Sequence, residues 1–188
     1  MTLRDYLKKE IELPEETINR LDNLMKYEEL PKGHQLFQEG SKSKKLIFVE
    51  KGILRLYYYK NDKDITHHFI TENSIYTPIE NVFLNEPYRY NVELIEDCVL
   101  RSVDFSTLEK HLDEDIYLQR FARLIAVSTI KMLADHLYSI QFQSAQERYN
   151  ILMEKHSDIL LRVPLGHIAS YLGITQQTLS VIRAGKGK

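Results

Sequence analysis

Residues 113–144, DEDIYLQRFARLIAVSTIKMLADHLYSIQFQS, contain neither glycine nor proline. About 30 helical residues would extend roughly 45 Å, far more than the average globular helix of about 11 to 12 residues. The apolar side chains lie on several faces: Leu118, Ile125 and Met132 at every seventh position, and Phe121, Leu124, Val127 and Leu133 elsewhere. A helix that is apolar on two sides needs two partners. We expect these to be its own domain and the same helix of a second copy, which predicts a homodimer; the alternative is burial inside one larger core.

The residues before this helix follow different patterns. Residues 3–25 predict two short helices, and residues 106–112 predict a third. From about residue 27 to residue 104, short alternating runs are separated by turn residues such as Lys51-Gly52 and the segment KNDKD. No crossover helix separates these runs, so an antiparallel barrel or sandwich is expected and a parallel sheet is not.

The C-terminal residues 159–188 contain no Asp or Glu; their charges are Arg162, Arg183, Lys186 and Lys188. Of the chain's 25 basic and 27 acidic residues, residues 1–158 therefore hold 21 basic and 27 acidic ones. Their net charge is -6, whereas that of residues 159–188 is +4. The tail also has helix-turn-helix spacing. Its apolar positions and turn are Ile168, Ala169, Leu172, Gly173, Ile174, Leu179 and Ile182.

The second helix of this pair should begin with Thr175 as its N-cap. With Leu179 and Ile182 directed inward, the outward residues are Gln176, Gln177, Ser180 and Arg183. Amide side chains can bond the adenine edge, and Arg and Lys can bond guanine or phosphate. An acid-free surface avoids repulsion from phosphate, so the tail is expected to bind double-stranded DNA rather than only to pack.

Composition excludes several classes of protein. No apolar run is long enough to span a bilayer, and the N-terminus lacks the apolar block of a signal peptide, so a cytoplasmic protein without a membrane is expected. Cys98 is the only cysteine, which excludes an intrachain disulfide or a cysteine-rich cluster. No catalytic grouping or phosphate loop is recognisable. We therefore predict no catalytic residue, no metal ligand and no cofactor.

The segments LPKGHQLFQEGSKSKKLIFVEKGILRLYYY and SAQERYNILMEKHSDILLRVPLGHIASYLGIT resemble the Crp/Fnr superfamily of bacterial transcription regulators, in the short form that lacks a full wing. The resemblance covers nearly the whole chain. It implies an α+β chain with a cyclic-nucleotide-binding-like antiparallel β-barrel, a long dimerisation helix and an all-α helix-turn-helix domain. The expected boundaries are 1–112 for the barrel with its N-terminal helices, 113–142 for the helix and 143–188 for the DNA reader.

Such regulators bind two-fold operators as dimers and contact RNA polymerase. The implied DNA-reading positions are Thr175, Gln176, Gln177, Thr178 and Ser180, to which the tail adds Arg183 and Lys186. Gln176-Gln177 replace the family's usual Arg-Glu pair, and Val181 replaces a second arginine. The operator should therefore differ from that of the best-known member, and Val181 is suited to a thymine methyl.

The family's nucleotide-binding positions are also changed. Thr77-Pro78 stand in place of a Gly-Glu pair, and proline has no N–H to donate to a phosphate. On the long helix, Leu133 and Ala134 fall where relatives contact adenine, and neither side chain can form a hydrogen bond. We therefore expect no response to cyclic AMP. An unidentified small-molecule effector remains an alternative, with Tyr76, Thr77, Arg89 and Tyr90 as its candidate residues.

Two other functions were compared with DNA binding. A small-molecule or cyclic-nucleotide sensor with a degenerate DNA reader is compatible with the same barrel. A cupin-like metalloenzyme would need two histidines at positions i and i+2, so that both point into a barrel. His67 and His68 are adjacent, so a strand would direct them to opposite sides. No histidine lies in a recognisable haem-ligand context, although the sequence does not exclude an axial histidine.

Overall fold

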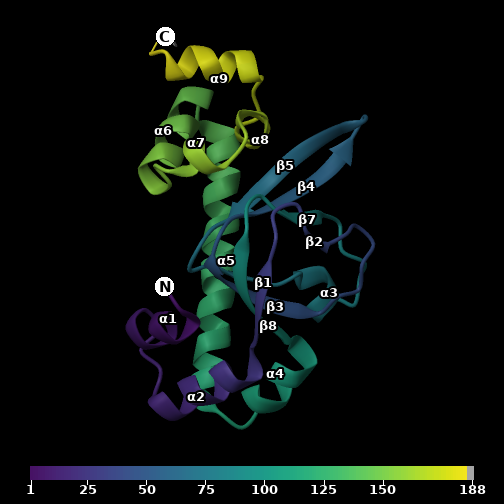
Figure 1. Ribbon diagram of the computed structural model, residues 1–188, viewed down its shortest axis with the longest axis vertical. Helices are drawn as coiled ribbons and strands as arrows, with labels where there is room; N and C mark the ends of the chain where they lie inside the picture. Colours follow the sequence, from purple (N-terminus) through teal and green to yellow (C-terminus); the bar gives the residue numbers. More distant parts are fainter. Residues whose placement is uncertain (186–188) are drawn as a thin grey trace. The chain divides into compact units, whose positions relative to one another are not determined.

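The computed structural model describes residues 1–185 and shows antiparallel sheets, a long helix and a helical C-terminal segment (Figure 1). The two N-terminal helices are α1 (Leu3–Lys9) and α2 (Glu15–Leu24). Two more lie in and after the strand region, α3 (Ile79–Phe83) and α4 (Phe105–Leu112). The fold class predicted from the sequence is confirmed.

Two four-stranded sheets form the barrel. The first has the strand order β1-β8-β3-β6, and its strands are β1 (Lys26–Leu30), β8 (Cys98–Asp104), β3 (Lys45–Lys51) and β6 (Ile75–Tyr76). The second has the order β2-β7-β4-β5, and its strands are β2 (Gln35–Phe37), β7 (Asn91–Leu94), β4 (Leu54–Lys60) and β5 (Lys63–Ile70). Every pairing of β3 and β8 is antiparallel.

Strand β3 is buried on both faces, because it separates two apolar clusters. Leu46 and Phe48 belong to a cluster formed with the helices, whereas Ile47 and Val49 belong to the cluster inside the barrel. Successive side chains of a strand point to opposite faces, so one strand can serve both clusters. This explains why its sequence, KLIFVEK, is almost continuously apolar in its centre.

The long helix α5 spans Ile116–Phe142 and begins later than the predicted residue 113, because Asp115 caps it. The Asp115 carboxylate accepts hydrogen bonds from the backbone N–H of Tyr117 (2.9 Å) and Leu118 (3.3 Å). Near its start, Leu118 and Phe121 are buried in an apolar cluster that also contains residues of α1, α2 and α4. No helix within residues 1–185 is long and apolar enough to cross a membrane.

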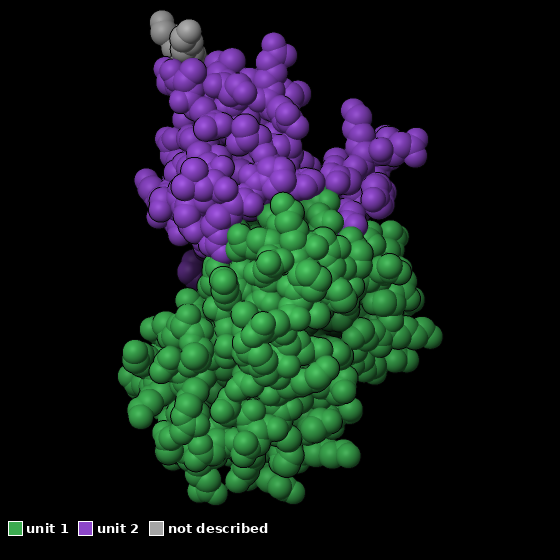
Figure 2. All heavy atoms as spheres, viewed as in Figure 1, with its two compact units in different colours: residues 1–56, 69–127 green, residues 57–68, 128–188 purple. Residues whose placement is uncertain are grey.

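The chain divides into two compact units, coloured separately in Figure 2. The first comprises residues 1–56 and 69–127, and the second comprises residues 57–68 and 128–188. The β4–β5 hairpin tip, where Asn61 and Asp62 adopt positive φ angles of 51° and 58°, therefore groups with the C-terminal helices. The functional boundaries expected near residues 112 and 142 remain a prediction.

Candidate nucleic-acid interface

Within residues 143–185, four short helices follow α5: α6 (Ala145–Lys155), α7 (Ile159–Arg162), α8 (Leu165–Tyr171) and α9 (Gln176–Arg183). Helices α8 and α9 coincide with the two helices expected from the tail. Their shared core consists of the residues predicted to face inward. Ile168, Ala169, Leu172 and Leu179 are at most 2% exposed, and Ile182 is 8% exposed.

The turn between α8 and α9 depends on Gly173, whose φ of 68° lies in the left-handed region that favours glycine. Its N–H donates to the Ser170 carbonyl at 3.0 Å, and the N–H of Ile174 donates to the Ala169 carbonyl at 3.0 Å. At the start of α9, the Thr175 hydroxyl accepts from the N–H of Thr178 at 3.1 Å. The expected turn and N-cap are therefore both present.

Arg148, on α6, joins the ends of two other helices. Its Nε and Nη2 donate to the Leu172 carbonyl at 3.2 and 2.9 Å, and its Nη1 donates to the Gln143 carbonyl at 2.6 Å. The last carbonyls of a helix have no partner within that helix, and a guanidinium can satisfy two such ends at once. The sequence contains no local signal for this role, because the contact between Arg148 and Leu172 spans 24 positions.

The outward face of α9 is polar and contains no carboxylate. Gln177, Val181 and Arg183 are exposed, Val181 at 45%. Lys186, which we also assigned to the interface, lies outside the described residues. The remaining assigned residues, Thr175, Gln176, Thr178 and Ser180, are exposed on the same helix or at its cap.

Four of these side chains make local contacts that restrict their reach. The Ser180 hydroxyl donates to the Gln176 carbonyl at 3.0 Å, and the hydroxyls of Thr175 and Thr178 are 2.9 Å apart. The Gln176 amide lies against α8, where a Cβ added to Gly166 would be 2.5 Å from its Nε2. Of the two glutamines, Gln177 is therefore the one not held against α8 by such a contact.

The four candidate effector residues lie in the first unit, in different surroundings. Tyr76 and Tyr90 pack beside the barrel cluster, together with Tyr88. The Thr77 hydroxyl is 3.4 Å from the Lys45 carbonyl. Arg89 is 69% exposed and forms a 3.4 Å ion pair with Glu86, so its guanidinium lies on the surface.

Polar groups that sequence reasoning did not select lie next to these aromatic residues. The Asn81 amide donates to the Ser41 carbonyl at 2.7 Å, and the Tyr88 N–H donates to the same carbonyl at 3.1 Å. Asn81 Oδ1, Ser41 Oγ and Tyr88 Oη are buried and have no hydrogen-bond partner among the described residues. Burial raises the pKa of the Tyr88 hydroxyl, which therefore stays protonated and can donate a hydrogen bond. Within residues 1–185, no group of three or more potential ligand side chains could hold a metal ion.

Comparison with known proteins agrees with this geometry. Residues 27–115 match the family model of the cyclic nucleotide-binding domain. Among solved structures, FixK2 from Bradyrhizobium japonicum superposes with a TM-score of 0.73 at 20% identity, covering 86% of this chain and 83% of that one. The chain has the Crp/Fnr fold.

Two further structures show the same fold. A mutant of CooA from Carboxydothermus hydrogenoformans matches with a TM-score of 0.73 and 19% identity over 98% of this chain and 84% of its own. A regulator from Eubacterium rectale described as a Crp/Fnr family member matches with a TM-score of 0.70 and 13% identity, over 96% of this chain and 87% of its own. A search of curated proteins found no match. The resemblance expected from the sequence is thus confirmed, with the cyclic nucleotide-binding domain at residues 27–115.

Proposed function

We propose that this protein is a sequence-specific, DNA-binding transcription regulator of the Crp/Fnr type that acts as a homodimer and is not an enzyme. The single observation that carries the proposal is the capped, acid-free outer face of α9 on a closely packed α8–α9 pair. Residues 143–188 would form the reader, 113–142 the dimerisation helix and 1–112 the effector-like domain. A cytoplasmic location and a contact with RNA polymerase follow from this role.

Base reading is assigned mainly to Gln177 and Val181. A glutamine can form two hydrogen bonds with adenine N6 and N7, and a branched apolar side chain can contact a thymine methyl. Arg183, in the last turn of α9, is placed to contact a phosphate or guanine. Thr175, Gln176, Thr178 and Ser180 lie around them and would contact the DNA backbone or set the position of α9.

The exposed apolar surface of α5 supports dimerisation. Val127 is 58% exposed, Ile130 is 66% exposed and Leu137 is 55% exposed, and their spacing places them on one side of the helix together with Ala134. Positions separated alternately by three and four residues form the seam of a two-stranded coiled coil. Pairing two copies along this seam would remove these side chains from water and place two α9 helices on a two-fold operator.

The barrel supports a second role as the sensor of a small molecule other than cyclic AMP. Pro78 precedes α3 and lacks an N–H, while the rings of Phe37, Tyr76 and Tyr88 pack with centroids 6.0 to 6.4 Å apart. The buried Asn81 and Tyr88 groups would favour a ligand that can hydrogen-bond. Calorimetry should show no heat of binding with cyclic AMP, and saturable heat would refute this assignment.

Selection from a random duplex pool tests DNA binding. The expected product is a two-fold motif with half-sites about one helical turn apart, bound with an affinity that falls steeply as salt rises. Gln177→Ala should relax preference at one position in each half-site and leave the salt dependence unchanged. Arg183→Ala should instead lower the slope of log K against log salt by about one per protomer.

Gln119→Ala is a matched control, because Gln119 is an exposed glutamine on α5 and lies in the first unit. It should reproduce the parent motif and affinity. Recovery of no enriched motif, with no retention of duplex even at low salt, would contradict the assignment of α9 as a reader.

A further inference from the structure

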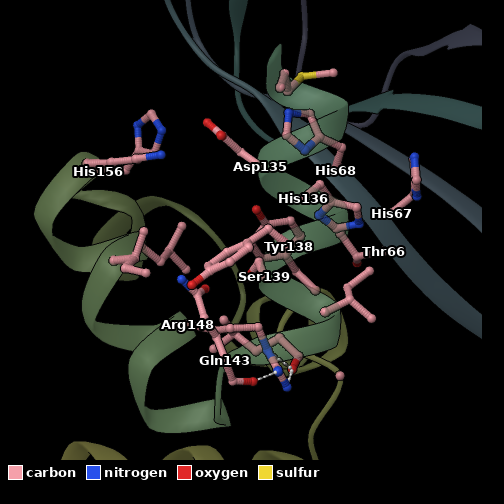
Figure 3. Close-up of a pocket in the computed structure, with 18 of the residues that line it drawn as sticks. Thr66, His67, His68, Asp135, His136, Tyr138, Ser139, Gln143, Arg148 and His156 are labelled. Atoms are coloured by element: carbon pink, nitrogen blue, oxygen red, sulfur yellow. Dashed lines mark hydrogen bonds between the residues drawn. The ribbon is translucent and has the colours of Figure 1, made fainter. Parts of the chain in front are cut away.

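A pocket of about 1080 Å³ lies wholly within the second unit. It is lined by the β4–β5 hairpin, the C-terminal half of α5, α6 and the end of α8. Four of the chain's seven histidines line it: His67, His68, His136 and His156 (Figure 3). The first two come from β5, the third from α5 and the last from the end of α6. Four histidines from three elements in one pocket require an explanation that the proposed DNA contacts do not supply.

Ring contacts connect the hairpin with both α5 and α8. The His67 and His136 rings are nearly perpendicular, with centroids 5.6 Å apart. Tyr171 of α8 is stacked on His136 at 6.3 Å and lies 6.2 Å from His68. Beside them, the N–H of Thr66 donates to the Ser170 hydroxyl at 2.9 Å, across 104 positions of sequence. We call His67, His68 and His136 the histidine cluster.

The electrostatic surroundings of the cluster do not favour added positive charge. The ionisable side chains that line the pocket are Tyr58, His67 and His68 from the hairpin; Lys131, Asp135, His136 and Tyr138 from α5; Arg148, Glu154, Lys155 and His156 around α6; and Tyr171 from α8. Three of them are permanent cations and two are carboxylates. One carboxylate, Asp135, already bonds the Lys131 ammonium at 2.8 and 2.9 Å.

Burial lowers the pKa of His68 to about 4, and repulsion by His67, His136 and His156 adds to this effect. Burial also lowers the pKa of His136. Both imidazoles are therefore uncharged at neutral pH in this arrangement. An uncharged ring tolerates the apolar and aromatic contacts described above, whereas a protonated ring would lose hydration without gaining a carboxylate partner.

We propose that the histidine cluster is a pH-sensitive contact: the uncharged rings of His68 and His136 hold the β4–β5 hairpin against α8, and acidification releases the hairpin. Since α8 is the first helix of the proposed reader, the effect on DNA binding rests on the proposed function. The release itself does not.

The direction and size of the effect follow from the two states of His68. In the released state its ring is in water, where the usual pKa is about 6.5. Protons therefore bind the released state more strongly, so the closed state is fully favoured above about pH 6.5 and loses stability down to about pH 4. The ratio of released to closed molecules should rise about 30-fold between about pH 7.5 and about pH 5.

Nuclear magnetic resonance can test the release without DNA. Imidazole resonances report the titration of each histidine, and the exchange protection of the Thr66 amide, corrected for intrinsic rate, reports its bond to Ser170. We expect His68 to titrate well below about pH 6. The exchange protection of the Thr66 amide should fall about 30-fold between about pH 7.5 and about pH 5. Titration of His68 at an ordinary value, or protection that does not change with pH, would overturn the proposal.

Variants distinguish release caused by titration of the histidine cluster from a general effect of acid on the protein. His68→Gln cannot titrate and should remove most of the pH dependence of Thr66 protection; His136→Gln, a second variant in case the first does not fold, should reduce it. His111→Gln, on α4 in the first unit, is the matched control and should respond like the parent. An unchanged pH response in both folded cluster variants would refute the role of the cluster. A normal release with no DNA binding at any pH would instead count against the proposed function alone.

Discussion

Replacement of Arg148 by methionine tests how the second unit supports the reader. The change removes three charge-assisted hydrogen bonds to main-chain carbonyls while keeping much of the apolar stem. Leu172 is only 2% exposed, so its carbonyl would lose its partner in a largely buried position. An unsatisfied buried polar group costs about 1 to 3 kcal/mol, and hydrogen bonds to charged groups contribute about 1.5 to 3 kcal/mol.

We therefore expect Arg148→Met to lower the free energy of unfolding of the second unit by about 3 kcal/mol. For a unit of this size, that corresponds to a melting temperature lower by roughly 12 to 24 °C. Thermal and urea unfolding, monitored by far-UV circular dichroism, would measure the changes in melting temperature and free energy of unfolding. The stability of Arg148→Lys should lie between those of the parent and Arg148→Met, because a lysine ammonium lacks the planar guanidinium fork that reaches both helix ends.

Arg89→Met is the matched control for Arg148→Met. Arg89 is 69% exposed, and its ion pair with Glu86 is on the surface, so its loss should change stability by less than about 0.5 kcal/mol. If the free energy of unfolding of Arg148→Met were within about 1 kcal/mol of that of the parent, the assignment of Arg148 as the main connection between α5 and α8 would be wrong.

Three further substitutions test other parts of the structure. Ile130→Glu should convert a dimer to monomer in analytical ultracentrifugation, because it places a charge in the proposed seam, whereas Leu161→Glu, at a 90% exposed site on α7, should leave the dimer intact. Asp115→Ala should destabilise the first unit by about 2 to 3 kcal/mol in urea unfolding, because it removes the cap of α5 and the buried bond from Thr17; a loss below about 0.5 kcal/mol would contradict that role. Thr175→Ala should cost about 1 kcal/mol of stability through loss of the α9 N-cap, and an unchanged unfolding midpoint would count against that cap.

The proposed reader was predictable because its constraints are local. Gly173 provides the turn and Thr175 provides the cap. The apolar residues recur at helical spacing, so Leu179 and Ile182 are buried as expected. The departures from expectation are small and concern side-chain reach. Only the packed structure shows that the Gln176 amide lies against Gly166 and that the Ser180 hydroxyl bonds its own helix.

The barrel was predictable as a fold but not as a site. Alternating runs indicated antiparallel strands, and turn residues such as Lys51-Gly52 separated them. The surface position of Arg89 and the burial of Asn81 could not be read from neighbouring residues. Asn81 bonds Ser41, 40 positions away, and no periodic pattern encodes such a partner.

The sequence by itself determined the position of α5 to within a few residues, the helix-turn-helix spacing and the acid-free tail, because each depends on residues within a few turns of one another. The tertiary structure alone decided which distant side chains meet. It placed His67 beside His136, Thr66 beside Ser170 and Arg148 at two helix ends. Those contacts join residues far apart in the chain, so their geometry and their effect on charge exist only once the elements have packed.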